Sequence, residues 1–215
     1  MYDLYSPNKG IKGYQVTTMT MQSTKTSIKE DIPTTDITGI EEKLIQQTFI
    51  NANELANGDK IPCEPGIYCI KLRDNACLPA KYGQLREDRI IYIGKATTDL
   101  KKRLWEEELN NKRPATFFRS IGAMLGYLPP KGALIGKKNT KSYKFNSEDT
   151  KEIKKWIQNS LDVNFVSVIP TEIKNIETYL IQKYRPLVNI KDNPTPSAEL
   201  KAARNRCMEW ANSAE

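Results

Sequence analysis

Five sequence features combine residue types that could act together on one substrate. The tripeptides Gly66-Ile67-Tyr68 and Tyr92-Ile93-Gly94 each place a tyrosine on a predicted strand. Arg103 follows on the next predicted helix, Glu177 lies on a later one, and Asn189 comes twelve positions after Glu177. Arginine can neutralise an oxyanion, a carboxylate can bind a hard divalent cation, and a tyrosine hydroxyl can take part in proton transfer.

The absence of histidine from the chain narrows this chemistry. Ser-His-Asp and Cys-His catalysis, zinc hydrolysis by a HExxH motif and a histidine general base are all excluded. If the chain is a hydrolase, water must be activated by a tyrosine, a lysine, a carboxylate or a metal-bound hydroxide. The cysteines Cys63, Cys69, Cys77 and Cys207 form no C-x-x-C pair, so we expect reduced thiols rather than a structural zinc site.

Length and charge indicate one domain with appendages and a polyanionic partner. The chain has 215 residues, enough to bury a core without disulfides. Its formal net charge of +7 suits a nucleic acid, although many basic proteins bind no acidic partner. No apolar run approaches the roughly 20 residues that span a bilayer, and the N-terminus shows no secretory signal. We therefore expect a cytoplasmic protein without membrane contact.

The elements that must position these residues follow from hydrophobic spacing and turn signals. Residues 1–37 are rich in Thr, Ser and Lys without periodicity, which predicts a polar N-terminal arm. Apolar residues at helical spacing predict an N-terminal helix within 38–60. Strands are predicted at 66–72, 89–94 and 161–169, and further helices at 99–111, 114–127, 147–160, 171–184 and 197–211.

This order predicts an α+β fold, in which a small, mainly antiparallel three-stranded sheet is flanked by helices. We expect a domain over 61–192, a C-terminal helix within 193–215, and a basic irregular insertion at about 129–145. The insertion lysines are either phosphate contacts or part of a solvated loop. They are Lys131, Lys137, Lys138, Lys141 and Lys144.

The two tripeptides, Arg103, Glu177 and Asn189 together resemble the GIY-YIG nuclease family, which is named for those tripeptides. Both are present without substitution, and the likeness runs from Gly66 to Asn189. It implies a GIY-YIG-like fold over the predicted domain. It also implies an endonuclease that hydrolyses phosphodiester bonds, with DNA as its expected partner and Mg²⁺ or Mn²⁺ as its cofactor.

The resemblance implies a role for each matching residue. Glu177 corresponds to the single metal ligand, Arg103 to the phosphate-binding arginine, and Tyr68 and Tyr92 to the two active-site tyrosines. Lys95 stands where some members, among them the repair nuclease that incises damaged DNA, have a lysine. The residues that would support the architecture of the site are Gly66, Gly94 and Asn189.

Elementary chemistry gives these roles a physical basis. Phosphodiester hydrolysis adds negative charge to oxygens that Arg103 can neutralise through two N–H donors, and Mg²⁺ on Glu177 can polarise the phosphate. A tyrosine has an ordinary pKa of about 10, so it is a poor base unless a cation such as Lys95 favours the phenolate. We expect Tyr92 to accept the proton of the attacking water and Tyr68 to orient it, and the reverse assignment stays open.

Position 107 departs from the family pattern. Several restriction-enzyme members carry a histidine one turn after the arginine, where this chain has Glu107. Glu107 could pair with Arg103 at i,i+4 spacing and reduce its charge, or it could contribute to metal binding. The departure motivates a second hypothesis, a catalytically weak or inactive nucleic-acid-binding module of the same fold. A third is an interaction protein without any nucleic-acid role.

Four of the candidates also have a purely structural interpretation. Tyr68 and Tyr92 could be strand aromatics packed in a core. Glu177 could be an exposed helix acid paired with Lys174 or Lys183, and Lys95 could be an ordinary surface lysine.

Overall fold

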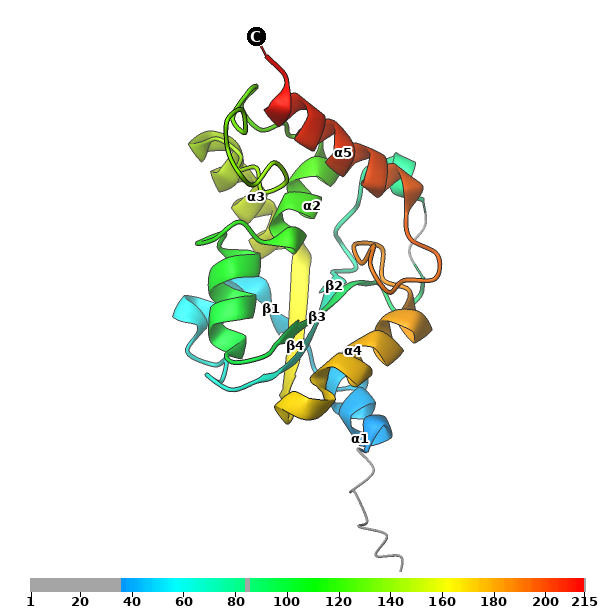
Figure 1. The fold of residues 1–215 in the computed structure, drawn as a ribbon. Helices are drawn as coiled ribbons and strands as arrows, with labels where there is room; N and C mark the ends of the chain where they lie inside the picture. The colour runs from blue at the N-terminus through cyan, green and yellow to red at the C-terminus, as the bar shows by residue number, and fades with distance from the viewer. Residues whose placement is uncertain (1–35, 84–85, 215) are drawn as a thin grey trace, which may run out of the picture. The chain divides into compact units, whose positions relative to one another are not determined.

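An antiparallel sheet lies at the centre of the computed structural model, which describes residues 36–83 and 86–214 (Figure 1). Its strands are β1 (Ile50–Asn51), β2 (Gly66–Leu72), β3 (Ile90–Ala96) and β4 (Leu161–Ser167), in the order β1-β4-β2-β3. The predicted α+β class is confirmed, but the sheet has four strands rather than three. The predicted arm over 1–37 lies outside the described residues except for its last two positions.

The helices differ in type as well as length. The α-helices are α1 (Ile37–Glu41), α2 (Thr116–Leu125), α3 (Ser147–Ser160), α4 (Pro170–Tyr184) and α5 (Ala198–Asn212). Two segments are π-helical, η1 (Glu42–Gln46) and η4 (Lys101–Leu109), and two are 3₁₀-helical, η2 (Ala52–Gly58) and η3 (Ala80–Tyr82). Among the described residues, no helix combines the length and apolarity needed to cross a membrane.

The sheet separates two hydrophobic clusters because side chains alternate along each strand. Ile67 and Cys69 of β2 pack with Ile173 and Ile176 of α4 on one face. Tyr68 and other residues of β2 and β3 pack on the opposite face with α2, α3, η4 and α5. Figure 1 shows α4 on one side of the sheet and α2 and α3 on the other.

The register of β2 and β3 brings the two tripeptides together. Tyr68 pairs with Gly94, and Ile70 pairs with Tyr92. Residues separated by more than twenty positions therefore become neighbours, with both tyrosines on the same face of the sheet.

The prediction of one helix over 38–60 is wrong. The first helical stretch ends at Gln46, Ile50 of β1 then pairs with Val163 of β4, and the separate 3₁₀-helix η2 follows from Ala52. The side-chain amide of Asn164 donates to the carbonyls of Lys43 (2.8 Å) and Leu44 (3.0 Å), which supplies partners that a continuing helix would have provided. Tertiary pairing thus outweighs the local helical pattern.

Glu41 attaches the first helix to α4. Its carboxylate accepts hydrogen bonds from Tyr184 and Tyr179 (3.4 Å) and pairs with Lys183 at 2.6 Å. Burial alone raises the pKa of Glu41, but the hydrogen bonds from Lys183 and Tyr184 lower it overall. The ionised carboxylate therefore stabilises this contact.

Residues 187–190 lie along the outer edge of β3. Val188 donates its amide to the carbonyl of Ile91 at 2.8 Å. Asn189 bonds Ile93 twice, accepting from its amide at 2.9 Å and donating to its carbonyl at 2.8 Å. The segment therefore satisfies backbone groups that an edge strand would leave to solvent.

The insertion over 129–145 is irregular, as expected, and packs against α5. The amide of Leu134 donates to the carbonyl of Ala211 at 2.7 Å, and that of Gly132 to Trp210 at 3.2 Å. In Figure 1 this segment lies with α3 and α5, away from α4.

Candidate active site

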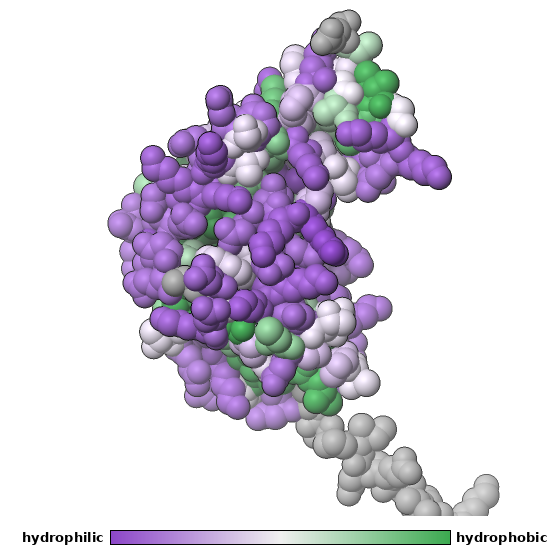
Figure 2. Space-filling view, turned by 90° about the vertical axis from the view of Figure 1, so that its left-hand side faces the viewer, coloured by the Kyte–Doolittle hydropathy of each residue, from purple (hydrophilic) through white to green (hydrophobic). Residues whose placement is uncertain are grey.

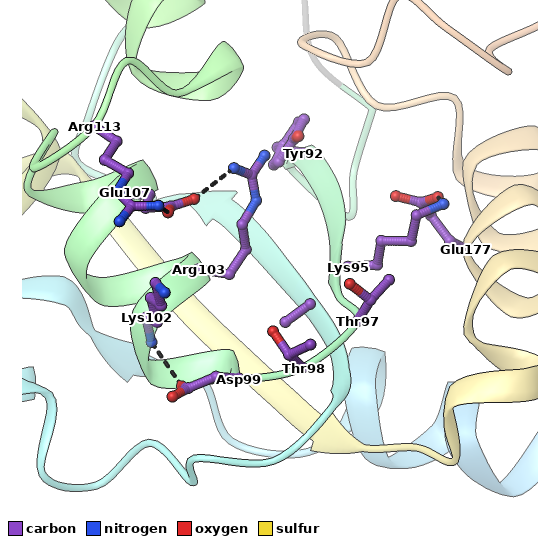
Figure 3. A pocket seen from close by; sticks show the side chains of 11 residues that line it. Tyr92, Lys95, Thr97, Thr98, Asp99, Lys102, Arg103, Glu107, Arg113 and Glu177 are labelled. Atoms are coloured by element: carbon purple, nitrogen blue, oxygen red, sulfur yellow. Dashed lines mark hydrogen bonds and ion pairs between the residues drawn. The ribbon is translucent and has the colours of Figure 1, made fainter.

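A pocket of about 460 Å³ opens where β3, η4 and α4 approach one another (Figure 3). Because β3 is an edge strand, residues from both faces of the sheet can meet around its border. The pocket is lined by Tyr92, Lys95, Ala96, Thr97, Thr98, Asp99, Lys102, Arg103, Glu107, Arg113 and Glu177. Four of the five predicted catalytic residues therefore line one cavity, and Tyr68 does not.

Tyr68 lies behind the pocket, with 0% of its surface exposed, while Tyr92 is 8% exposed. Their ring centroids are 6.1 Å apart. Burial raises the pKa of each phenol above its ordinary range, and the Glu108 carboxylate raises both further. Both tyrosines are therefore neutral at physiological pH, and only Tyr92 reaches the cavity.

The two glycines of the tripeptides leave room for this arrangement. A Cβ at Gly94 would stand 2.7 Å from Cε2 of Tyr68, and one at Gly66 would stand 2.6 Å from Cδ1 of Leu100 and still closer to the carbonyl of Val166. Both distances are too short for a real side chain. The expected support role of these glycines thus has a steric basis. Asn189 contributes through its two hydrogen bonds to Ile93, the residue that follows Tyr92 on β3.

Arg103 lies between two carboxylates of η4. Its Nη1 donates to Glu107 at 2.9 Å, and its Nη2 lies 2.6 Å from Glu108. A π-helix brings positions i+4 and i+5 close to position i, so one guanidinium can reach both acids. Figure 3 shows Glu107 and Arg113 beside Arg103 at the rim of the pocket. The expected i,i+4 pairing of Glu107 with Arg103 is present.

Lys95 and Glu177 form the opposite wall. Lys95 Nζ lies 2.6 Å from Glu177 Oε2, and the Glu177 side chain is 13% exposed. The structure thus places Glu177 against β3, not in an ion pair with Lys174 or Lys183. Figure 3 shows this pair across the cavity from Arg103.

Asp99, Glu107 and Glu177 supply the carboxylates that line the pocket, and Glu177 is the one that the resemblance assigns to a divalent cation. Mg²⁺ keeps several water ligands and commonly uses one or two protein carboxylates, so a single carboxylate in an open, polar pocket fits it. Within 36–83 and 86–214, no group of three or more His, Cys, Asp or Glu side chains is arranged to hold a metal. A site built from several protein ligands is therefore not found in this part of the chain.

Glu108 is the residue that the sequence interpretation missed. It is 0% exposed and contacts both Tyr68 and Arg103. A signal was present, because Leu100, Leu104 and Glu108 are spaced four apart. An acid on the apolar stripe of a predicted helix is unusual.

The insertion lysines lie outside this pocket. Lys131 stacks over the ring of Trp210 at 5.3 Å, and Lys137 belongs to a separate cavity in the insertion. None of the five lines the cavity that holds Arg103 and Glu177.

Comparison with known proteins gives one match. A family model described as GIY-YIG catalytic domain matches residues 66–206, a range that includes every predicted catalytic residue and the first part of α5. No curated protein and no solved structure matches the chain.

Proposed function

The chain belongs to the GIY-YIG catalytic domain family, a family of endonucleases, and from this premise we propose that it is a divalent-metal-dependent endonuclease acting on DNA. One observation carries the proposal. Tyr92, Lys95, Arg103 and Glu177 come from three separate elements and line a single polar pocket.

The pocket supports a division of roles between its two walls. Arg103 would bind nonbridging oxygens of the scissile phosphate, where negative charge increases during attack. Glu177 would hold Mg²⁺ or Mn²⁺, which supplies Lewis-acid polarisation of the phosphate when bound. Lys95 would provide a second positive charge beside the phosphate once it leaves Glu177.

The tyrosines differ in access, which supports Tyr92 as the one that contacts the attacking water. Tyr68 is fully buried, so it would not contact the substrate and would act by holding neighbouring side chains in position. Because burial raises the pKa of Tyr92, its phenol is neutral and holds its own proton, so it would orient the attacking water through a hydrogen bond rather than accept the proton of that water.

The surface fits a polar partner. Figure 2 shows that the face at the left of Figure 1 is covered mainly by hydrophilic residues, with apolar ones scattered among them. A formal net charge of +7 favours a polyanion.

The direct test is cleavage of supercoiled plasmid, branched DNA and RNA with Mg²⁺ or Mn²⁺. The intact protein should cleave DNA, and Glu177→Ala and Arg103→Ala should each lower the rate at least about 100-fold. Glu152→Ala, which removes an exposed acid on α3, should leave it unchanged. Folded protein that leaves every substrate intact would refute the proposal.

A second function is favoured by one specific observation. Arg103 pairs with Glu107, and Glu177 pairs with Lys95, so both functional charges are already neutralised. A weakly active or inactive nucleic-acid-binding module would retain these pairs. It would bind DNA in a salt-sensitive manner without cleavage, and Glu177→Ala would leave binding unchanged.

A further inference from the structure

Glu108 is a buried acid whose oxygens are all directed at other residues. Oε1 accepts a hydrogen bond from the Tyr68 hydroxyl at 3.2 Å and lies 2.6 Å from Arg103 Nη2. Oε2 accepts from the backbone amide of Phe117 at 3.1 Å, at the start of α2. One oxygen thus serves two candidate active-site residues, and the other serves the protein backbone.

Packing alone does not explain an acid at this position. Leu100 and Leu104, which precede Glu108 on the same stripe, are both fully buried, so a leucine at 108 would continue the apolar surface. A buried carboxylate is costly unless it is paired and hydrogen-bonded. Its presence here is therefore explained by the groups that it contacts, Tyr68, Arg103 and the amide of Phe117.

The two acids that contact Arg103 differ in access. Glu107 lines the pocket, so an arriving phosphate can take its place on Nη1. Glu108 has no exposed surface and cannot touch a substrate. Its contact with Nη2 therefore persists while the other side of the guanidinium changes partner.

We propose that Glu108 is a positioning residue of the active site, which fixes the Arg103 guanidinium and the Tyr68 hydroxyl so that Arg103 presents its Nη1 group, now paired with Glu107, to the phosphate. The inference rests on the proposed function, because it assigns Arg103 to the phosphate. Glu108 acts through Arg103 and does not contact the substrate.

The test is a double-mutant cycle between positions 108 and 103. Glu108→Gln keeps the side-chain volume but leaves one acceptor oxygen for three donors. We expect it to lower the single-turnover cleavage rate about 10- to 100-fold, the usual effect of losing a hydrogen bond to a charged group. In an Arg103→Ala background, the same change should have little further effect, since its target is gone.

The same double-mutant cycle is also measured by DNA binding, because some variants will cleave too slowly for a rate to be measured. Affinity for a short DNA duplex is measured in a Glu177→Gln background, where Glu108→Gln should weaken binding roughly 3- to 10-fold only when Arg103 is present. The matched control is Glu106→Gln, which changes a partly exposed acid of the same helix that pairs with Lys112 outside the pocket, and it should change neither quantity more than about twofold. If wild-type protein cleaves nothing, the proposed function fails while the binding cycle still tests Glu108.

Two results would overturn the inference. One is an equal loss from Glu108→Gln with and without Arg103, which indicates a purely structural role. The other is no loss at all. Should Glu108→Gln fail to fold, Arg103→Met is compared with Arg103→Met/Glu108→Met, in which apolar groups replace the buried pair. Equal DNA binding by these two proteins supports action through Arg103, and weaker binding by the double variant contradicts it.

Discussion

Replacing Glu107 by glutamine should make the protein bind DNA more tightly, because it weakens a competitor for Arg103. Glu107 Oε2 lies 2.9 Å from Arg103 Nη1, and both residues line the pocket. A phosphate must replace this carboxylate before it can bind there. The amide of glutamine is neutral and holds the guanidinium less strongly.

The size of the gain follows from the exposure of the pair. The Arg103 and Glu107 side chains are 33% and 15% exposed, so the pair is neither fully solvated nor buried. Exposed pairs contribute about 0.2–1 kcal/mol, and buried hydrogen bonds to charged groups about 1.5–3 kcal/mol. A value near 1 kcal/mol corresponds to roughly fivefold tighter binding. Neutralising one more phosphate should steepen the dependence of log affinity on log salt by about 0.9.

The assay is fluorescence anisotropy with a short labelled duplex, in a Glu177→Gln background that prevents cleavage. Affinity is measured over a series of salt concentrations. The control is Glu106→Gln, which changes net charge equally but removes an acid that pairs with Lys112 at 2.8 Å outside the pocket. It should shift affinity less than about twofold.

The reasoning is refuted if Glu107→Gln binds DNA no better than the parent. It is also refuted if Glu106→Gln gives the same gain, since the effect would then be one of overall charge.

Three further substitutions test the architecture. Asn189→Ala removes the side-chain partner of the Ile93 amide and carbonyl on β3. Thermal unfolding should therefore show that the free energy of unfolding falls by about 2–4 kcal/mol, or that Tm falls by roughly 5–15 °C. Gly94→Ala should displace the Tyr68 ring, costing about 1–3 kcal/mol in denaturant unfolding and lowering the cleavage rate; an unchanged rate would contradict the steric role. Glu41→Gln tests a pH dependence: the pKa of Glu41 is lowered in the folded state, so its stabilisation is present above its unfolded pKa of about 4.3 and is lost as the pH falls through the lower folded value. Denaturant unfolding should therefore show the variant less stable than wild type at pH 7, with a difference that shrinks below about pH 4.

Local sequence patterns predicted the elements that carry the tripeptides. Ile67 and Cys69 alternate with Tyr68 and Ile70, and this period of two is a property of the strand itself. β2 and β3 follow one another along the chain, and consecutive strands usually pair in a sheet, as these two do. The resemblance then added Glu177, whose place beside β3 depends on the packing of α4.

The features that the sequence did not reveal depend on contacts between distant segments. The helix over 38–60 was wrong because Ile50 pairs with Val163, a partner more than a hundred positions away. Lys95 meets Glu177 across 82 positions. The burial of Glu108 had a local signal in its spacing from Leu100 and Leu104, but its contact with Arg103 had none: a spacing of five does not share a face of an α-helix, and nothing local indicated π-helical geometry.

The covering of the outer edge of β3 also bears on self-association. An uncovered strand edge can template pairing with another chain, the first step in many forms of β-aggregation. Here the segment that contains Val188 and Asn189 occupies part of that edge, and the opposite edge of the sheet is β1, only two residues long. A fragment ending at Tyr184 would expose β3 and should aggregate through it, so light scattering of that fragment would report on a protection that the full chain possesses.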